Sequence, residues 1–210
     1  MAERRRSSEV RQVELTDAAL HIIATKGIAA LSTRSLAEHV GLTSGAIFRH
    51  FPSIEALLDA VVARVDAVLE STYPPSDLPP RERLERFVAA RSAAMGSQVG
   101  IVRLVLSEQF SLALPEGGAA RLTACVHKTR DFLRQCIREG QTTGEIRKDL
   151  DADALAVVVM GTTQLLAVSA ATLRQRASEA QAVRDALSAL LRPPAVRAKT
   201  RKKKGERRST

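Results

Sequence analysis

Apolar residues recur at helical spacing along almost the whole chain, and no convincing segment alternates apolar with polar residues as a half-buried strand does. Only 3% of the residues are aromatic and there is no Trp, so the core has to be built mainly from Ala, Leu and Val. That composition favours helices over strands. With 210 residues the chain can bury a sizeable core. We therefore predict an all-α fold of about nine helices.

Glycine and proline residues divide the chain into its predicted helices. Gly27 and Gly41 end the first two helices. Ser32 is placed to cap the second, and Ser53, directly after Pro52, is placed to cap the fourth. The expected helices span residues 10–26, 32–39, 44–50, 53–72, 80–98, 101–113, 118–140, 152–175 and 178–192. A boundary near Pro52 separates a small three-helix unit with a basic N-terminal arm, residues 1–51, from a larger helical body, residues 52–192.

The net charge of +9 is concentrated at the end of the chain. The segment 52–192 contains seventeen basic and seventeen acidic residues, whereas the segment 193–210 contains eight basic residues and one acidic residue. We predict that this basic tail is disordered and that it attracts any polyanion without reading its sequence. Non-specific DNA binding of the nucleoid type, driven by the tail, is therefore one function that the composition leaves open.

Two short predicted helices flank Gly41 in the stretch LSTRSLAEHVGLTSGAIFRHF, residues 31–51. This is the pattern of a helix-turn-helix, whose second helix can enter the major groove of DNA. That helix opens with small and hydroxyl-bearing residues, which suit base edges, and ends with two residues suited to phosphate oxygens. The first group is Thr43, Ser44, Gly45 and Ala46, the second is Arg49 and His50, and the inward face is Leu36, Ala37, Val40, Ile47 and Phe51. On shape and chemistry alone, DNA binding and an ordinary helical hairpin both stay open.

Residues 16–58 closely resemble the DNA-binding domain of TetR-family transcriptional repressors. The resemblance lies in the segments AALHIIATKG, LSTRSLAEHVGLTSGAIF and RHFPSIEALL. It implies that Thr33 contacts phosphate and that Arg34 reaches a base or a phosphate. The predicted DNA-binding residues are Thr33, Arg34, Thr43, Ser44, Gly45, Ala46, Phe48, Arg49 and His50.

Two positions depart from the pattern of that family. Phe48 stands where the family usually has Tyr, whose hydroxyl contacts phosphate, so only packing is assigned to Phe48. Ile54 stands where the family usually has Lys, which removes one phosphate anchor per subunit. We hypothesise that Arg4, Arg5 and Arg6, together with the basic tail, partly replace this anchor.

A single helix-turn-helix reads only one half-site, so such proteins usually dimerise on an inverted repeat. The resemblance implies that the last two helices of each subunit form a four-helix interface. The candidate interface residues are Val157, Met160, Gln164, Leu165, Val168, Val183, Leu187 and Leu190. The alternative is that both helices bury their apolar faces within one subunit.

The resemblance also implies a small-molecule pocket in the body, and an effector that releases a repressor from a palindromic operator. The candidate pocket residues are Arg91, Met95, Arg103, Phe110, His127, Phe132 and Gln164. Plain core or surface packing remains the alternative for each of them. A largely aliphatic lining suits an apolar or amphipathic effector.

No motif of an enzyme is found in the sequence. The chain lacks a Gly-rich phosphate loop, an HExxH and a GxSxG motif, and its four His are scattered. No group of Cys and His has the spacing of a metal site. We predict that the protein is not an enzyme and uses no cofactor and no metal. A helix-turn-helix that serves only protein contacts is a further alternative.

Cys125 and Cys136 lie on one predicted helix, too far apart to form a disulfide, and this fits a reducing cytoplasm. The start of the chain has no apolar segment of the kind found in signal peptides. Residues 154–173 carry no charge and are long enough to span a bilayer, but the polar residues GTTQ interrupt them. We predict a buried helix there, inside a bundle or against a second subunit, and a cytoplasmic protein.

Overall fold

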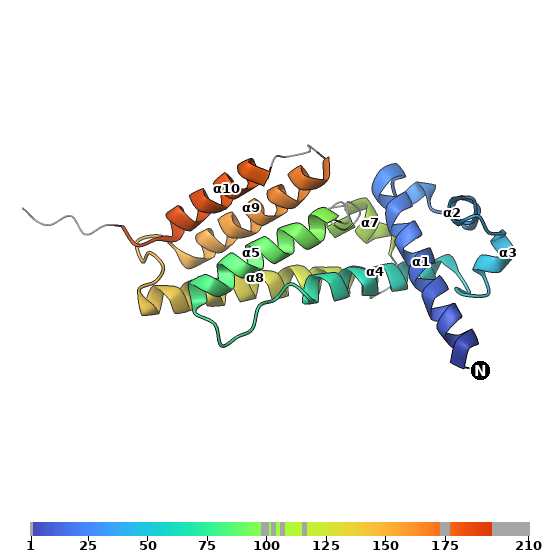
Figure 1. The fold of residues 1–210 in the computed structure, drawn as a ribbon, viewed down its shortest axis with the longest axis horizontal. Helices are drawn as coiled ribbons and strands as arrows, with labels where there is room; N and C mark the ends of the chain where they lie inside the picture. Colours follow the sequence, from blue (N-terminus) through green and yellow to red (C-terminus); the bar gives the residue numbers. More distant parts are fainter. Residues whose placement is uncertain are drawn as a thin grey trace, which may run out of the picture.

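The computed structural model describes residues 2–97, 101, 104–105, 108–114, 117–172 and 177–194. Within these residues the chain forms nine α-helices and one 3₁₀ helix, without a strand (Figure 1). The predicted all-α fold is therefore confirmed. The predictions made for Arg103 and for most of the basic tail, residues 195–210, fall outside the described residues.

The N-terminal helices gather at one end of the molecule (Figure 1). They are α1 (Ala2–Lys26), a 3₁₀ helix (Ile28–Ala30), α2 (Thr33–Val40) and α3 (Ser44–Ile47). Helix α1 begins at Ala2, eight residues before the predicted start at residue 10. The paired serines at positions 7 and 8, a residue type that favours the N-cap of a helix, lie inside this helix instead.

Helix α3 is shorter than predicted. It ends at Ile47, and residues 48–50 form a turn. The amides of Arg49 and His50 donate to carbonyls three residues earlier, those of Ala46 and Ile47, at 3.3 and 2.9 Å. These i to i−3 bonds tighten the chain at the end of the helix, so the predicted phosphate-binding residues lie in a turn.

Helix α4 (Ile54–Glu70) joins the N-terminal helices to the body (Figure 1). Its N-cap is Ser53, as predicted, whose hydroxyl accepts from the amide of Ala56 at 3.2 Å. The helix packs against α1 on one side and against α5 and α8 on the other. It buries Leu57, Leu58, Val61, Val62, Val65 and Leu69. A movement of α4 would therefore be felt by both parts of the chain.

The body is a bundle of long helices (Figure 1). Its described helices are α5 (Pro80–Ser97), α7 (Glu108–Ala113), α8 (Gly118–Thr143), α9 (Ala152–Thr172) and α10 (Ala177–Leu191). Helices α5, α8 and α9 pack on one another, and α10 lies against α9. Their shared core contains Phe87, Leu133, Ile137, Leu155 and Val159. The core is mostly aliphatic, as the composition predicts.

Helix α9 contains a window, Ala152–Ser169, that by length and composition alone is apolar enough to cross a membrane. Inside the subunit, 44% of this window is buried. One face of α9 therefore packs in the bundle, as predicted for residues 154–173. The opposite face leaves apolar side chains uncovered by the subunit itself.

Candidate nucleic-acid interface and ligand cavity

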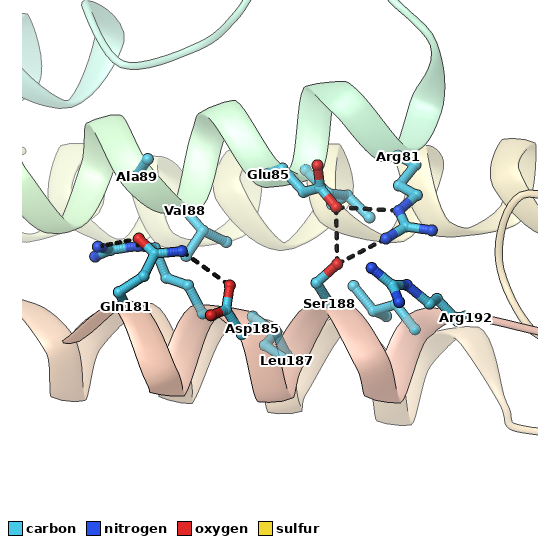
Figure 2. A pocket seen from close by; sticks show the side chains of 12 residues that line it. Arg81, Glu85, Val88, Ala89, Gln181, Asp185, Leu187, Ser188 and Arg192 are labelled. Atoms are coloured by element: carbon cyan, nitrogen blue, oxygen red, sulfur yellow. Dashed lines mark hydrogen bonds and ion pairs between the residues drawn. The ribbon is translucent and has the colours of Figure 1, made fainter. Parts of the chain in front are cut away.

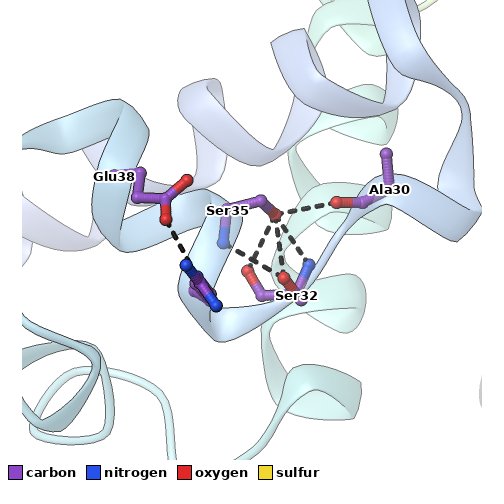
Figure 3. A network of polar contacts seen from close by, with 5 residues as sticks. Ala30, Ser32, Ser35 and Glu38 are labelled. Atoms are coloured by element: carbon purple, nitrogen blue, oxygen red, sulfur yellow. Dashed lines mark hydrogen bonds and ion pairs between the residues drawn. The ribbon is translucent and has the colours of Figure 1, made fainter.

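The start of α2 is fixed by two serines, the N-cap Ser32 and Ser35 in the first turn (Figure 3). The hydroxyl of Ser32 accepts from the amide of Ser35 at 3.1 Å, and the hydroxyl of Ser35 accepts from the amide of Ser32 at 3.0 Å. The Ser35 hydroxyl also donates to the carbonyl of Ala30 at 2.7 Å. These bonds satisfy amides that a helix start leaves open, and they fix the position of Thr33 and Arg34 directly beside them.

Replacing Ser35 with Ala removes the reciprocal cap and the bond to Ala30. We expect the free energy of unfolding to fall by about 1 kcal/mol, the usual cost of a lost cap. Thermal unfolding of the Ser35→Ala variant measures this, with Ser44→Ala as a control on an exposed residue of the neighbouring helix. An unchanged midpoint in Ser35→Ala would show that the cap does not stabilise α2.

Gly41 makes the turn between the two short helices. Its φ is +68°, in the left-handed region where a residue with a side chain is strained, and its amide donates to the carbonyl of Ala37. The amide of Leu42 donates to the same carbonyl at 2.9 Å. The turn thereby ends α2 and redirects the chain into α3, as the sequence predicts.

The first turn of α3 is a small polar surface held on an apolar anchor. Thr43 caps the helix, its hydroxyl accepting from the amide of Ala46 at 3.3 Å. Ser44 and Gly45 are exposed, and a Cβ on Gly45 would meet no atom within 4 Å. Ile47, at the end of α3, is fully buried in the core and anchors the helix to the rest of the fold. Three of the four predicted base-contacting residues, Thr43, Ser44 and Gly45, are therefore exposed at the start of α3, and Ala46 is half-buried beside them.

The predicted phosphate-contacting residues border that surface. Arg34 and Arg49 are exposed, and Arg34 forms an ion pair with Glu38 at 3.0 Å. Because both partners are exposed, this pair contributes little and can yield to a phosphate. Phe48 is 51% exposed, so much of its ring is available to a partner. Ile54, the first residue of α4, is partly buried and packs against the N-terminal core, which is the apolar cluster that includes Leu36 and Ile47.

His50 is tied to the long N-terminal helix, a contact that the sequence does not predict. Its Nδ1 lies 3.4 Å from the hydroxyl of Ser8, and its carbonyl accepts from Nε2 of Gln12 at 3.0 Å. These contacts join residues about forty positions apart in the sequence, so no local pattern could reveal them. They place the N-terminal half of α1 beside the turn that follows α3.

A small cavity lies where α4, α5, α8 and α9 meet. Its volume is about 30 Å³, enough for one or two water molecules. It is lined by Leu69, Phe87, Arg91, Met95, Val105, Cys125, Val126, Thr129, Met160, Thr163 and Gln164. Three of the predicted pocket residues, Arg91, Met95 and Gln164, thus lie around one cavity.

The other predicted pocket residues lie elsewhere. Phe132 stands beside the cavity, its ring 5.1 Å from those of Phe87 and Tyr73. Phe110 is buried in the N-terminal core. His127 is exposed, on α8. The position of each of these three depends on how α8 and its neighbours pack, which periodicity alone does not determine.

Arg91 is the charged residue among the described residues that line this cavity, and only 3% of its surface is exposed. Its guanidinium carbon lies 4.8 Å from the ring centre of Phe87 and 5.1 Å from that of Tyr73. Burial lowers its pKa, and the hydroxyl of Tyr73 opposes that shift. A guanidinium nevertheless stays charged at neutral pH, so the cavity holds a positive charge.

Cys125 lines the same cavity and donates from its thiol to Oδ1 of Asp66 on α4. Burial, followed by this bond to a carboxylate, raises the pKa of the thiol to about 12. The thiol is therefore protonated at neutral pH and a poor nucleophile. Cys136 is buried in the body core, where desolvation raises its pKa to about 11.

A larger, open groove of about 440 Å³ runs between α5 and α10 (Figure 2). Its polar side chains bind one another. Arg81 donates to Glu85 at 3.0 Å and to Ser188 at 2.7 Å, and Ser188 donates to Glu85 at 2.9 Å. Further along, Gln181 donates to Asp185 at 2.8 Å. The network joins the two helices and accounts for these groups without a ligand.

The predicted interface residues divide into two groups. Val157 and Leu165 are 56% and 63% exposed on α9, and the exposed Gly161 lies between them at helical spacing. Leu187 is buried within the subunit, and Met160 and Val183 pack on the same core. The remaining members, Gln164, Val168 and Leu190, are partly buried. The exposed face of α9 is thus an apolar stripe that the subunit itself leaves uncovered.

These features define a class, that of helix-turn-helix DNA-binding proteins. The unit that would contact DNA, residues 1–51, is called the reading head below, and α4 joins it to an all-helical body. Comparison with known sequences agrees. The profile described as "Bacterial regulatory proteins, tetR family" matches residues 15–61, and that described as "Tetracyclin repressor-like, C-terminal domain" matches residues 113–187. The chain belongs to the tetR family of bacterial regulatory proteins, and it is a DNA-binding transcriptional regulator.

Individual relatives extend the match over most of the chain. The HTH-type transcriptional regulator SrpR of Pseudomonas putida is 29% identical over 198 residues, 90% of this chain and 88% of SrpR. The repressor KstR2 of Rhodococcus jostii is 27% identical over 154 residues, 68% of this chain and 71% of the relative. The resemblance found in residues 16–58 is thus confirmed, and it continues into the body.

Solved structures share the fold. The ketosteroid transcriptional regulator KstR2 of Mycobacterium tuberculosis superimposes with a TM-score of 0.72 at 23% identity, over 86% of this chain and 92% of that one. AibR, in complex with isovaleryl coenzyme A and operator DNA, gives a TM-score of 0.69 at 18% identity, over 88% of this chain and 99% of AibR.

Proposed function

We propose that this protein is a homodimeric repressor that binds a palindromic operator and is released from it by a small molecule. The observation that carries the proposal is the exposed first turn of α3, where Ser44 and Gly45 stand clear of the fold while Ile47 is fixed in the core. A rigid helix start with small side chains suits close approach to base edges. The fold shared with AibR, whose structure holds both operator DNA and a thioester ligand, supports a ligand-responsive regulator.

The proposal assigns a task to each part of the chain. Residues 1–51 read the DNA, residues 52–192 bind the effector and dimerise, and residues 193–210 attract phosphate without reading sequence. The contacts to DNA come from Thr33, Arg34, Thr43, Ser44, Gly45, Ala46, Phe48, Arg49 and His50. The protein acts in the cytoplasm, where the chromosome lies, and it is a regulator and not an enzyme. Among the residues that the structure describes, no group of three or more His, Cys, Asp or Glu could hold a metal ion.

Helix α4 is the element that could carry a signal between the two sites. It lines the cavity through Leu69 at its C-terminal end and packs against α1 along its length. Polar contacts fix it to α8: Asp66 binds Arg121 at 2.7 Å and Glu70 binds Lys128 at 2.6 Å. A ligand that displaces Leu69 would shift α4, and with it the reading head, which is the two-state coupling that allostery requires.

The test is to incubate the full-length protein with sheared genomic DNA at about 150 mM salt and to sequence the retained fragments. We expect an enriched inverted repeat whose half-sites lie about one helical turn apart. Retention without a preferred sequence that vanishes as the salt concentration rises would contradict the proposal and support non-specific, tail-driven binding.

A further inference from the structure

The cavity between α4, α5, α8 and α9 holds the buried positive charge of Arg91, and no carboxylate of the described residues forms an ion pair with it. Among the described residues, Nε and Nη2 of Arg91 have no hydrogen-bond partner. Donors of a charged group that are buried and unpaired are costly, and most proteins avoid them. The rings of Phe87 and Tyr73 offset part of the cost by cation–π attraction, and the hydroxyl of Tyr73 also hydrogen-bonds to the Arg91 side chain, but neither residue supplies a carboxylate.

Two acids that adjoin cavity-lining residues are already engaged by other groups. Asp66 accepts from Arg121 and from the thiol of Cys125, and Glu70 accepts from Lys128. Both acids are on α4, where Glu70 follows the cavity-lining Leu69 and Asp66 contacts the cavity-lining Cys125. The charge of Arg91 is therefore compensated only from a distance within the described part of the chain.

Arg83 provides a comparison on the same helix. It is also almost wholly buried, with 7% of its surface exposed, and its Nε likewise has no hydrogen-bond partner among the described residues. Its Nη2, however, donates directly to the carboxylate of Glu139. The fold can therefore supply a carboxylate to a buried arginine of α5. At Arg91, two helical turns further along α5, the side chain lines a cavity and has no such carboxylate partner among the described residues.

We propose that this cavity binds an apolar compound bearing one carboxylate, which pairs with Nε and Nη2 of Arg91. The inference rests on the proposed function, since it names the chemical class of the effector. A carboxylate matches the fork of a guanidinium in two parallel hydrogen bonds, which is what these two nitrogens offer. The remaining lining, which includes Leu69, Met95 and Met160, suits a hydrocarbon body.

The small volume of the cavity, about 30 Å³, means that the ligand must enlarge it. Met95 and Met160 stand on α5 and α9, and their unbranched side chains can change rotamer at little cost. Leu69 on α4 is a third wall that must move. The carboxylate site thus connects ligand entry to the helix that supports the reading head.

The experiment measures the binding of butanoate, hexanoate, octanoate and phenylacetate to the full-length dimer by calorimetry, each beside its uncharged amide. We expect at least one carboxylate to bind roughly tenfold to a hundredfold more tightly than its amide, and Arg91→Met to abolish that difference. Arg91→Lys, which keeps the charge but loses the fork, should retain part of it. Octanoyl coenzyme A is included, because its acyl end carries no carboxylate.

Arg83→Met is the matched control for a buried arginine of α5. It removes the arginine partner of Glu139, which keeps only the bond from Gln135, so it should lower the melting temperature while leaving the preference for carboxylate intact. Arg91→Met, which removes an uncompensated charge, should not lower the melting temperature of the ligand-free protein.

The proposal is overturned if amides and acids bind alike, if Arg91→Met keeps the preference, if Arg83→Met loses it as well, or if only the coenzyme A ester binds. Operator binding is measured separately on the same samples. Operator binding without carboxylate selectivity refutes this inference and leaves the repressor function standing. Carboxylate selectivity without an operator refutes the function and leaves the cavity assignment standing.

Discussion

The Gly45→Glu variant should lose operator binding while remaining folded. The affinity for the enriched operator should fall roughly a hundredfold or more, because each subunit of the dimer places a carboxylate against base edges and phosphates. The fold tolerates the change, since a Cβ at this position meets no atom within 4 Å and the residue is exposed. Replacing a helical Gly with another residue favours the helix by up to about 1 kcal/mol.

Fluorescence anisotropy with the labelled operator, together with thermal unfolding of the same samples, measures both effects. Gly45→Ala is the matched control: it makes the same gain in helix propensity but adds only a methyl group and no charge. We expect its affinity to stay within roughly tenfold of the parent, in line with one altered groove contact per subunit. Wild-type affinity in Gly45→Glu would show that the first turn of α3 does not face DNA.

The predictions that depended on neighbouring residues in the sequence agree best with the structure. Ser32 and Ser53 cap the helices that follow them, and Gly41 adopts the left-handed conformation that ends α2. Each of these features is determined within a few residues by a hydroxyl or by a missing side chain, so the sequence contains all of the relevant information. The all-α fold follows in the same way from periodicity and from the scarcity of aromatic residues.

The predictions that depended on tertiary contacts were less complete. Helix α1 continues back to Ala2, where its start contacts the turn at His50 through Ser8 and Gln12. Helix α3 ends early because the chain tightens into i to i−3 bonds after Ile47. The contacts of α1 join residues that are close in space and distant in sequence. The end of α3 is local, but helix propensity is only a weak guide to where a helix stops.

The same limit applies to the candidate cavity. Three of its predicted residues, Arg91, Met95 and Gln164, do line one space, because helical spacing places them on inward faces. The sequence cannot show that Arg83 has a carboxylate partner and that Arg91 has none among the described residues, because Glu139 is 56 positions from Arg83. The charge state of the cavity is therefore information that only the packed bundle provides.

The Leu165→Asp variant should be monomeric. Leu165 is 63% exposed in the subunit, so the change costs the isolated subunit little, whereas a dimer formed through this face of α9 would bury it twice. Losing two buried leucines and burying two carboxylates should weaken the dimer by at least about 4 kcal/mol, roughly a thousandfold in its dissociation constant. Operator affinity should fall with it, because a monomer reads only one half-site.

Sedimentation over a range of protein concentrations measures the dissociation constant, and anisotropy measures the loss on the operator. Leu112→Asp is the matched control, since Leu112 is 81% exposed on α7 and the substitution is the same. If only Leu165→Asp dissociates, the apolar stripe on α9 is the dimer interface and the effect is not a general one of added charge. If Leu165→Asp stays dimeric, another surface joins the subunits. In that case, the spacing of the two reading heads has to be derived from that surface instead.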